Sequence, residues 1–378
     1  MTMKSRTIMK AFLTLFIIVI LAVVVFAFEK YLASDSGVNP DIVRHIRLRE
    51  QSPGSLNFYM PDDYYMSRTD SLIQKKYRLE IDENGFIMPS IVHEVADLTV
   101  VFLGGSTTEC IFVDEANRFP YLAGRFLENE ERKVNSINSG VCSSNSMHSI
   151  DILLNKILPF QPDIAVMMHN VNDLNILLYE GSYWNDNPTR SLIVSENNSS
   201  VKSVQRIIKN TLPNLYRRSR ILLKHLMETE KNDEFAHLRG KRLKIDRLFL
   251  TGSFSKNLEL FIYICRIHGI IPVLMTQANR CKADPDRLIL NTWNLNADFG
   301  LSYSQYKNIY DLFNDTIREV GKKNEVLVID LAVEIPPEKE YIYDFTHFND
   351  RGSRQAARVI ADCLKANVLM GNYSGRGD

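Results

Sequence analysis

The chain is 378 residues long, enough for two or three domains or for one large α/β domain with insertions. Its 45 lysines and arginines balance its 45 aspartates and glutamates, so the formal net charge is zero and supplies no field for holding a polyanion such as nucleic acid. Hydrophobic residues make up 45% of the sequence and charged residues 24%, which is typical of a folded globular protein and excludes a disordered chain or a membrane protein with many spans.

The first predicted element is a transmembrane helix over residues 11–28. This run carries no charge, and as a helix it would extend about 27 Å, against a hydrocarbon core of about 30 Å. Basic residues precede it and acidic residues follow, so the positive-inside bias places residues 1–10 in the cytoplasm and the rest of the chain in the periplasm or the extracellular space. The alternative is a cleaved signal peptide, but its apolar region is usually about 7 to 15 residues and ends in small residues, unlike Val25-Phe26-Ala27.

Residues 29–95 form a polar juxtamembrane segment. Within it, residues 77–90 (YRLEIDENGFIMPS) contain two short extended runs on either side of Asn84 and Gly85, a pair that favours a tight hairpin turn. We therefore expect an edge hairpin just before the first strand of the domain that follows.

Residues 96–370 alternate short apolar runs with helical patterns. The runs predict strands at 98–103, 134–138, 163–168, 271–276 and 325–330, and the patterns predict helices near 117–131, 148–158, 254–268, 303–322 and 353–366. Strands that read as continuous Val, Ile, Leu and Met, separated by helices, indicate a parallel sheet covered on both faces. The predicted fold is a three-layer α/β/α sandwich with five parallel strands.

One stretch, residues 181–250, interrupts this alternation. It carries an Asn/Ser-rich loop at 195–200, a helix-breaking Pro213, and a positively charged segment at 201–250. We interpret it as a basic helical insertion, either a solvated cap or a docking face for anionic headgroups or an acidic polymer.

The five cysteines do not indicate a disulfide scaffold, and their odd number leaves at least one without a partner in the chain. Cys265 and His268 have a ligand-like spacing, but no second pair completes a tetrahedral metal site, so we predict no metal. Cys142 stands near Gly140, and because nothing close in sequence would activate its thiol, we expect it to be structural.

Polar residues follow each predicted strand, at the edge where open parallel sheets form their sites. They include a hydroxyl, a tight glycine, side-chain amides and an Asp/His pair, an inventory that suits acyl transfer. In chain order they are Ser106, Gly140, Asn172, Gln277, Asn279, Asp344 and His347.

Ser106 is the predicted nucleophile. A serine hydroxyl needs a neighbouring imidazole to remove its proton, and the imidazole needs a carboxylate to fix its tautomer, so His347 and Asp344 are the expected base and orienting group. The backbone N–H groups of Ser106 and Gly140 and the amide of Asn172 are the candidate donors to the oxyanion. Gly140 has no side chain, which would let its backbone approach the substrate closely.

Alternatives remain at three positions. His169 lies directly at a strand exit and is the best rival base, although His347 comes with Asp344 and precedes what reads as the capped start of a final helix. Gln277 and Asn279 are candidates either to bind substrate or to close a turn.

These residues resemble the SGNH or GDSL-type hydrolases, whose four sequence blocks supply a Ser, a Gly, an Asn and a His three residues after an Asp. The matches are FLGGSTTE at 102–109, NSG at 138–140, NVND at 170–173 and DFTH at 344–347. Gly105 stands where the family has Asp, and Asn170 where it usually has Gly; Asn tolerates a left-handed backbone, so we expect the turn to be kept. The resemblance implies a flavodoxin-like sheet.

The activity implied is that of a membrane-anchored serine esterase without metal or organic cofactor. The narrower likeness, a GGSTT block behind a membrane span, is to members associated with bacterial envelope polysaccharides, which favours an O-acetyl or other short acyl group on a surface glycan as substrate. An O-acyltransferase using the same site, or a catalytically inactive binding module that keeps the fold, are the alternatives.

Overall fold

The computed structural model describes residues 3–35, 42–197, 207–208, 211–212, 215, 240, 243, 245–294 and 300–369. The chain divides into two compact units. Unit 1 comprises Met1–Ile46 and Ile193–Asn232, and unit 2 comprises Arg47–Leu192 and Asp233–Asp378. Most of the predicted basic segment at 201–250 lies outside the described residues.

Unit 1 contains a helix and a strand pair. Helix α1, Met3–Asp35, includes the apolar run at 11–28, and many of its large apolar side chains are exposed, among them Phe12 and Val25. Strand β1, Ile42–Ile46, pairs antiparallel with β7, Ile193–Asn197. Within the part of the chain that the structure describes, no helix combines the length and apolar character needed to cross a membrane.

The predicted five-stranded parallel sheet is confirmed in unit 2. Its order is β5-β4-β6-β8-β9, all parallel, so the second strand along the chain lies outside the first, which is the flavodoxin-like order. The strands are β4 (Leu98–Gly104), β5 (Val134–Asn138), β6 (Ile164–Met168), β8 (Ile271–Met275) and β9 (Leu327–Ile329). The first four agree with the predicted ranges to within a residue, and β9 is shorter than predicted.

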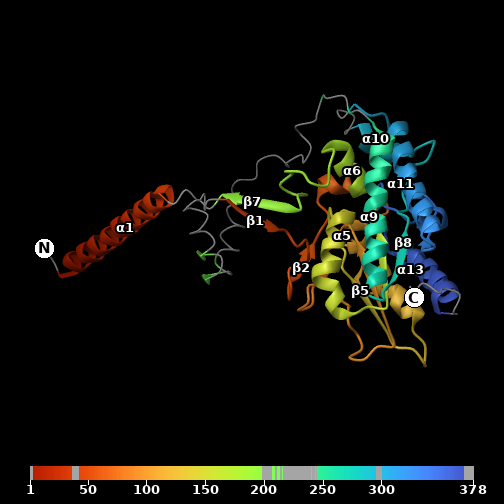
Figure 1. Ribbon diagram of the computed structural model, residues 1–378, viewed down its shortest axis with the longest axis horizontal. Coiled ribbons are helices and arrows are strands. Elements are labelled where there is room, and N and C mark those ends of the chain that lie inside the picture. Colours follow the sequence, from red (N-terminus) through yellow and green to blue (C-terminus); the bar gives the residue numbers. More distant parts are fainter. Residues whose placement is uncertain are drawn as a thin grey trace. The chain divides into compact units, whose positions relative to one another are not determined.

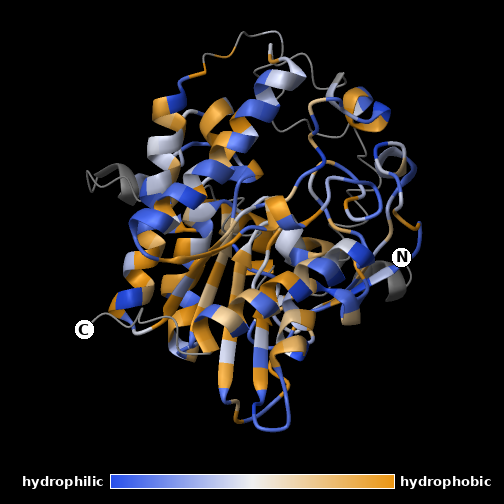
Figure 2. Cartoon of the chain, turned by 90° about the vertical axis from the view of Figure 1, so that its right-hand side faces the viewer, coloured by the Kyte–Doolittle hydropathy of each residue, from blue (hydrophilic) through white to orange (hydrophobic). Residues whose placement is uncertain are grey.

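Helices cover both faces of this sheet, because alternate residues of each strand point to opposite sides. In β4, Val101 and Leu103 join one core and Val100 and Phe102 join the other. Figure 1 shows α9 beside α11, and Figure 2 shows the apolar strands between the helical layers. The first core contains α5 (Ser146–Ile152), α6 (Val171–Tyr179), α9 (Arg247–Ile267) and α11 (Tyr303–Lys323), and the second contains α4 (Phe119–Leu127) and α13 (Asp350–Leu364).

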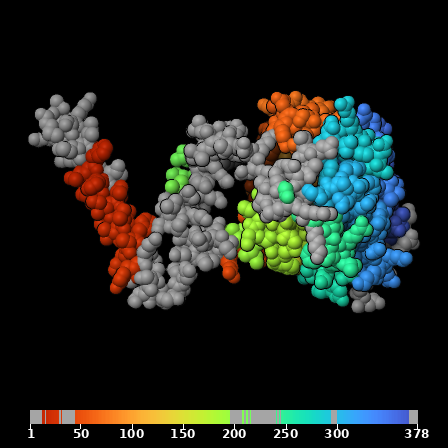
Figure 3. Space-filling view, turned by 90° about the horizontal axis from the view of Figure 1, so that it is seen from above, coloured from red at the N-terminus to blue at the C-terminus, as the bar shows by residue number. Residues whose placement is uncertain are grey.

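The surface of unit 2 reflects the same packing. Figure 3 shows the yellow-green surface that includes α6 beside the green surface of α9, two helices that share the first core.

Shorter elements complete the unit. They are β2 (Leu56–Tyr59), α2 (Asp63–Met66), β3 (Tyr77–Glu80), α3 (Ser106–Glu109), the 3₁₀ turns η1 (Glu115–Asn117) and η3 (Leu158–Phe160), the π turns η2 (Leu153–Ile157) and η6 (Lys365–Leu369), α10 (Arg287–Asn294) and α12 (Leu331–Glu334).

The turn predicted at Asn84 and Gly85 is present. Ile81 and Ile87 face each other across it, and Gly85 adopts a φ of +78°. The main partner of β3 is β2, however, an upstream strand that the sequence pattern did not reveal. Beyond the turn, Ile87 bridges to Asn138 in β5, so this hairpin does lie against the edge of the main sheet.

Candidate active site

Ser106 stands where β4 passes into α3, at the carboxyl edge of the sheet. Gly105 is the N-cap of α3 and makes Ser106 the first helical residue. The backbone N–H of a residue at this position has no partner within its own helix and is free to bind an anion. A side chain at Gly105 would collide with the Asn172 amide nitrogen, which explains why this position is glycine.

The structure brings Ser106 together with the predicted His347 and Asp344. The Ser106 Oγ lies 2.8 Å from His347 Nε2, and His347 Nδ1 lies 2.7 Å from Asp344 Oδ2. The other carboxylate oxygen, Asp344 Oδ1, accepts the backbone N–H groups of Thr346 and His347, each at 2.9 Å. We call Ser106, His347 and Asp344 the pocket triad.

The electrostatics of the triad suit a base and its orienting carboxylate. Burial acts to raise the pKa of Asp344, but the charge of His347 and the hydrogen bonds that Asp344 accepts hold that pKa below its ordinary value. Burial acts to lower the pKa of His347, yet attraction to Asp344, with a smaller contribution from Glu109, raises it above its ordinary value. The pair therefore stabilises an imidazolium next to a carboxylate.

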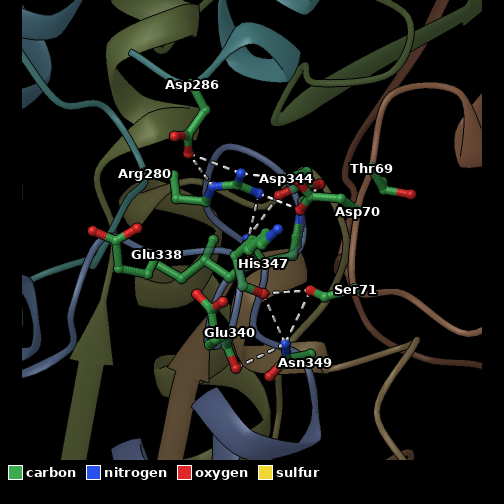
Figure 4. A network of polar contacts seen from close by, with 12 residues as sticks. Thr69, Asp70, Ser71, Arg280, Asp286, Glu338, Glu340, Asp344, His347 and Asn349 are labelled. Atoms are coloured by element: carbon green, nitrogen blue, oxygen red, sulfur yellow. Dashed lines mark hydrogen bonds and ion pairs between the residues drawn. The ribbon is translucent and has the colours of Figure 1, made fainter. Parts of the chain in front are cut away.

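A buried arginine holds the loop that carries the triad's acid and base. The Arg280 guanidinium donates to the carbonyl of Ile342 at 3.1 Å, and the backbone N–H of Arg280 donates to the carbonyl of Phe345 at 2.9 Å. Asp70 and Asp286 supply its counter-charges, and Figure 4 shows Arg280 between them, beside Asp344 and His347. Because Arg280 is almost fully buried, it fixes the loop from within the protein.

Of the three predicted oxyanion donors, Asn172 and Ser106 face the same pocket. Gly140 differs from the expectation, because its N–H donates to Asn138 Oδ1 at 2.9 Å. A side chain at Gly140 would collide with the backbone of Glu109 in α3, so glycine is required here for close packing against that helix rather than for approach to a substrate.

The pocket beside the triad has a volume of about 310 Å³. Its lining combines aromatic and apolar side chains with polar ones, among them one guanidinium, from Arg190. The lining residues are Ser106, Ser143, Val171, Asn172, Arg190, Trp293, Tyr306, Tyr310, Asp344, Phe345, Thr346 and His347. A few polar groups converging in an apolar pocket is the usual design of a small-molecule site.

Gln277 and Asn279, the candidates for substrate binding, do not line this pocket. The Gln277 side chain accepts from the backbone N–H of Val171 at 3.0 Å and donates to Thr107 Oγ1 at 2.8 Å. Asn279 accepts from the backbone N–H of Cys281 at 2.8 Å. Gln277 thus ties the start of α6 to α3, and Asn279 closes a turn.

His169, the rival base, lies in the protein interior. Its Nε2 is 2.6 Å from Ser149 Oγ, and its Nδ1 is 3.6 Å from Asp173 Oδ2. Burial lowers the pKa of His169 to about 3 and raises that of Asp173 to about 6. We call Ser149, His169 and Asp173 the buried set.

Asn170 does not adopt the left-handed backbone that its resemblance to a glycine position led us to expect, since its φ is −163°. Its side chain instead donates to the carbonyl of Tyr310 at 3.0 Å and to Asn314 Oδ1 at 2.9 Å. Asn170 therefore anchors the start of α6 to α11, which is a packing role that a glycine could not fill.

Two contacts at the site were not predicted. Arg190 donates to Asn172 Oδ1 at 3.2 Å, and Gln51 donates to the buried Glu109 Oε1 at 2.6 Å. Both donors come from loops without a motif, and the sequence offers no signal that would have found them.

Comparison with known proteins finds similarity in structure. No family model and no curated protein matches this chain. Among solved structures, an alpha/beta hydrolase enzyme from the metagenome of Lake Arreo is 14% identical, with 72% of this chain and 95% of that chain covered and a TM-score of 0.40. An acetylxylan esterase from Geobacillus stearothermophilus is 11% identical, with 72% and 94% covered and a TM-score of 0.40. A lipase/acylhydrolase from Enterococcus faecalis is 17% identical, with 71% and 96% covered and a TM-score of 0.40.

Proposed function

We propose that this protein is a serine esterase of the SGNH type that cleaves acyl esters through an acyl-Ser106 intermediate. The observation that carries the proposal is the continuous contact from Ser106 Oγ to His347 Nε2 at 2.8 Å and from His347 Nδ1 to Asp344 at 2.7 Å, at the wall of a pocket. A hydroxyl, an imidazole and a carboxylate in this order are the parts that nucleophilic acyl transfer requires.

In the proposed reaction, Ser106 Oγ attacks the carbonyl carbon of the ester while His347 Nε2 takes the hydroxyl proton. The former carbonyl oxygen becomes an oxyanion, which the Ser106 N–H and the Asn172 amide stabilise. The bond between the carbonyl carbon and the alcohol oxygen then breaks, and His347 returns the proton to the leaving alcohol. A water molecule attacks the acyl-serine with His347 again as base, which releases a carboxylic acid and restores Ser106.

The proposed substrate is a short acyl ester, such as an O-acetyl group, on a surface glycan or a smaller acylated molecule. A pocket of about 310 Å³ lies at the small end of ligand pockets and favours a short chain. Aromatic walls offer flat surfaces on which a sugar ring can lie. We expect no nucleic acid partner, because the chain has no net positive charge.

We also propose that residues 11–28 anchor the protein in a membrane, with the N-terminus in the cytoplasm and unit 2 in the periplasm or the extracellular space. The support comes from the sequence, in which an uncharged run follows basic residues. The membrane would then hold the site near envelope glycans, consistent with the proposed substrate.

The test is to incubate the purified full chain with a chromogenic acetyl ester and with an acetylated glycan, comparing wild type, Ser106→Ala and Ser149→Ala. We expect free acid from wild type and from Ser149→Ala, and none above background from Ser106→Ala. Acyl label appearing on an added sugar instead of in free acid would identify an O-acyltransferase. No release and no labelling of wild type by a fluorophosphonate would identify an inactive binding module.

A further inference from the structure

We propose that Arg190 is a positioning residue that orients and polarises the Asn172 amide as an oxyanion donor. This inference rests on the proposed esterase function. Arg190 lies between α6 and β7, outside the four sequence blocks, and its side chain lines the same pocket as Ser106 and Asn172.

The Asn172 amide is held at both ends. Its oxygen accepts from the Arg190 guanidinium at 3.2 Å, and its nitrogen donates to the carbonyl of Ser144 at 2.8 Å. A flipped amide would place its N–H groups against the guanidinium and its oxygen against a carbonyl, two repulsive contacts. The arrangement therefore fixes the amide nitrogen on the side of Gly105, next to Ser106.

An amide nitrogen carries two N–H bonds, and the bond to Ser144 uses one of them. The second remains for a substrate oxyanion near Ser106. Because the guanidinium withdraws electron density through the amide oxygen, this N–H becomes a stronger donor, as hydrogen bonds in a chain polarise one another. The Arg190 guanidinium is nearly fully buried, so solvent screens its charge weakly.

The turn that presents Arg190 is itself held in place. Asn187 Oδ1 accepts the backbone N–H of Thr189 at 3.0 Å, and the backbone N–H of Arg190 donates to the Asn187 carbonyl at 3.1 Å. Arg47 donates to the carbonyl of Pro188 at 2.7 Å, and Arg49 donates to that of Thr189. The guanidinium is thus set before substrate arrives, which is what electrostatic stabilisation of a transition state requires.

The rival role for Arg190 is direct binding of an anionic group on the substrate. The two roles give different kinetics. If Arg190 binds a substrate anion, its loss raises KM for an acidic ester and leaves a neutral ester unaffected. If Arg190 acts through Asn172, its loss lowers kcat for both esters and leaves KM nearly unchanged.

A double-mutant cycle on the full chain, with a neutral acetyl ester, tests the proposal. We expect Arg190→Met to lower kcat about 10- to 100-fold, as loss of a charge-assisted hydrogen bond predicts. Asn172→Ala should lower kcat about 10²- to 10³-fold, and adding Arg190→Met to Asn172→Ala should lower kcat almost no further. Arg190→Lys, which keeps the charge but not the planar fork, should lose less than Arg190→Met.

The matched control is Arg266→Met, which removes an arginine that donates to the Asn324 carbonyl away from the pocket and should leave kcat unchanged. If Arg190→Met lowers kcat by the same factor in wild type and in Asn172→Ala, the proposal is overturned. A change confined to KM would overturn it too. If Arg190→Met does not fold, the same cycle with Arg190→Lys decides.

Failure of the esterase function gives a different result. If wild type hydrolyses no ester but a fluorophosphonate labels Ser106, the rate of labelling replaces kcat in the cycle, because phosphonylation also develops charge on an oxygen near Asn172. If wild type is neither active nor labelled, the function itself is wrong, and the inference about Arg190 falls with it.

Discussion

Two sets of Ser, His and Asp side chains in the described part of unit 2 differ in their surroundings, since one set lines a pocket and the other is buried. In the pocket triad the histidine lies 2.7 Å from its carboxylate, and in the buried set the corresponding distance is 3.6 Å. Each histidine contacts a serine hydroxyl, at 2.8 Å in the triad and 2.6 Å in the buried set. Composition and serine contact alone therefore do not distinguish them.

The environments make the difference. In the pocket triad the attraction of Asp344 raises the pKa of His347, whereas burial lowers the pKa of His169 to about 3. Asp173 directs its oxygens to Ser146, through both the backbone N–H and the hydroxyl, and to Tyr183 at 2.6 Å. The buried set is a packing network that joins α5, α6 and the following loop. A histidine can act as a base where it is accessible from a pocket and where its carboxylate is hydrogen-bonded to it.

Removing each histidine in turn should give the largest difference between the pocket triad and the buried set. We expect His347→Ala to lower kcat on the order of 10⁶-fold, since loss of the base disables the whole triad. His169→Ala should instead lower the free energy of unfolding and leave kcat nearly unchanged in the folded fraction. Ester hydrolysis normalised to folded protein, with urea midpoints measured beside it, tests both; activity lost with His169→Ala and kept with His347→Ala would reverse our assignment of the base.

The two aspartates should differ in the same way, with a smaller effect. Asp344→Asn should lower kcat about 10⁴-fold, because the imidazole loses its fixed tautomer and its counter-charge. Asp173→Asn should lower the free energy of unfolding by about 1–3 kcal/mol through mispaired hydrogen bonds to Ser146 and Tyr183, with little effect on kcat. Matching losses of kcat in the two variants would contradict the distinction.

Most of the fold could be predicted, because its strands are continuous apolar runs and its helices have regular periodicity. The grouping of Ser106, Asp344 and His347 could be predicted too, since Ser106 follows closely after a strand and the other two lie in a loop after the last strand. What the sequence could not show were contacts made across long stretches of chain. Such contacts depend on how loops meet in space. They include the hydrogen bond from Arg190 to Asn172, the one from Arg280 to the loop of the triad, and the packing of Gly140 on α3.

The same limit explains why the sequence left the role of Gln277 open between substrate binding and closure of a turn. Gln277 stands at a strand exit, like Ser106, but its side chain is buried between Thr107 and the backbone of Val171. Position along a strand places a residue near the site edge, whereas the direction of its side chain depends on neighbours that the pattern does not reveal.

The smallest predicted effect is a shift in the pH dependence of kcat/KM, which depends on the pKa of His347. Burial raises the pKa of Glu109 to about 7, and the Glu109 carboxylate contributes to the raised pKa of His347. Because His347 must be neutral to accept the Ser106 proton, kcat/KM should rise as pH increases through its pKa. Glu109→Gln removes that negative charge, so the pKa of His347 should fall and the acidic limb of the profile should move to lower pH. A limb that stays in place or moves to higher pH would contradict this coupling.

The most direct measurement is the intact mass of the full chain after treatment with a fluorophosphonate. An activated serine beside a base reacts with this reagent, whereas a buried hydroxyl does not. Our account predicts one phosphonyl adduct on wild type, the same adduct on Ser149→Ala, and none on Ser106→Ala. An unmodified wild type, or an adduct that persists on Ser106→Ala, would contradict the assignment of Ser106 as the nucleophile.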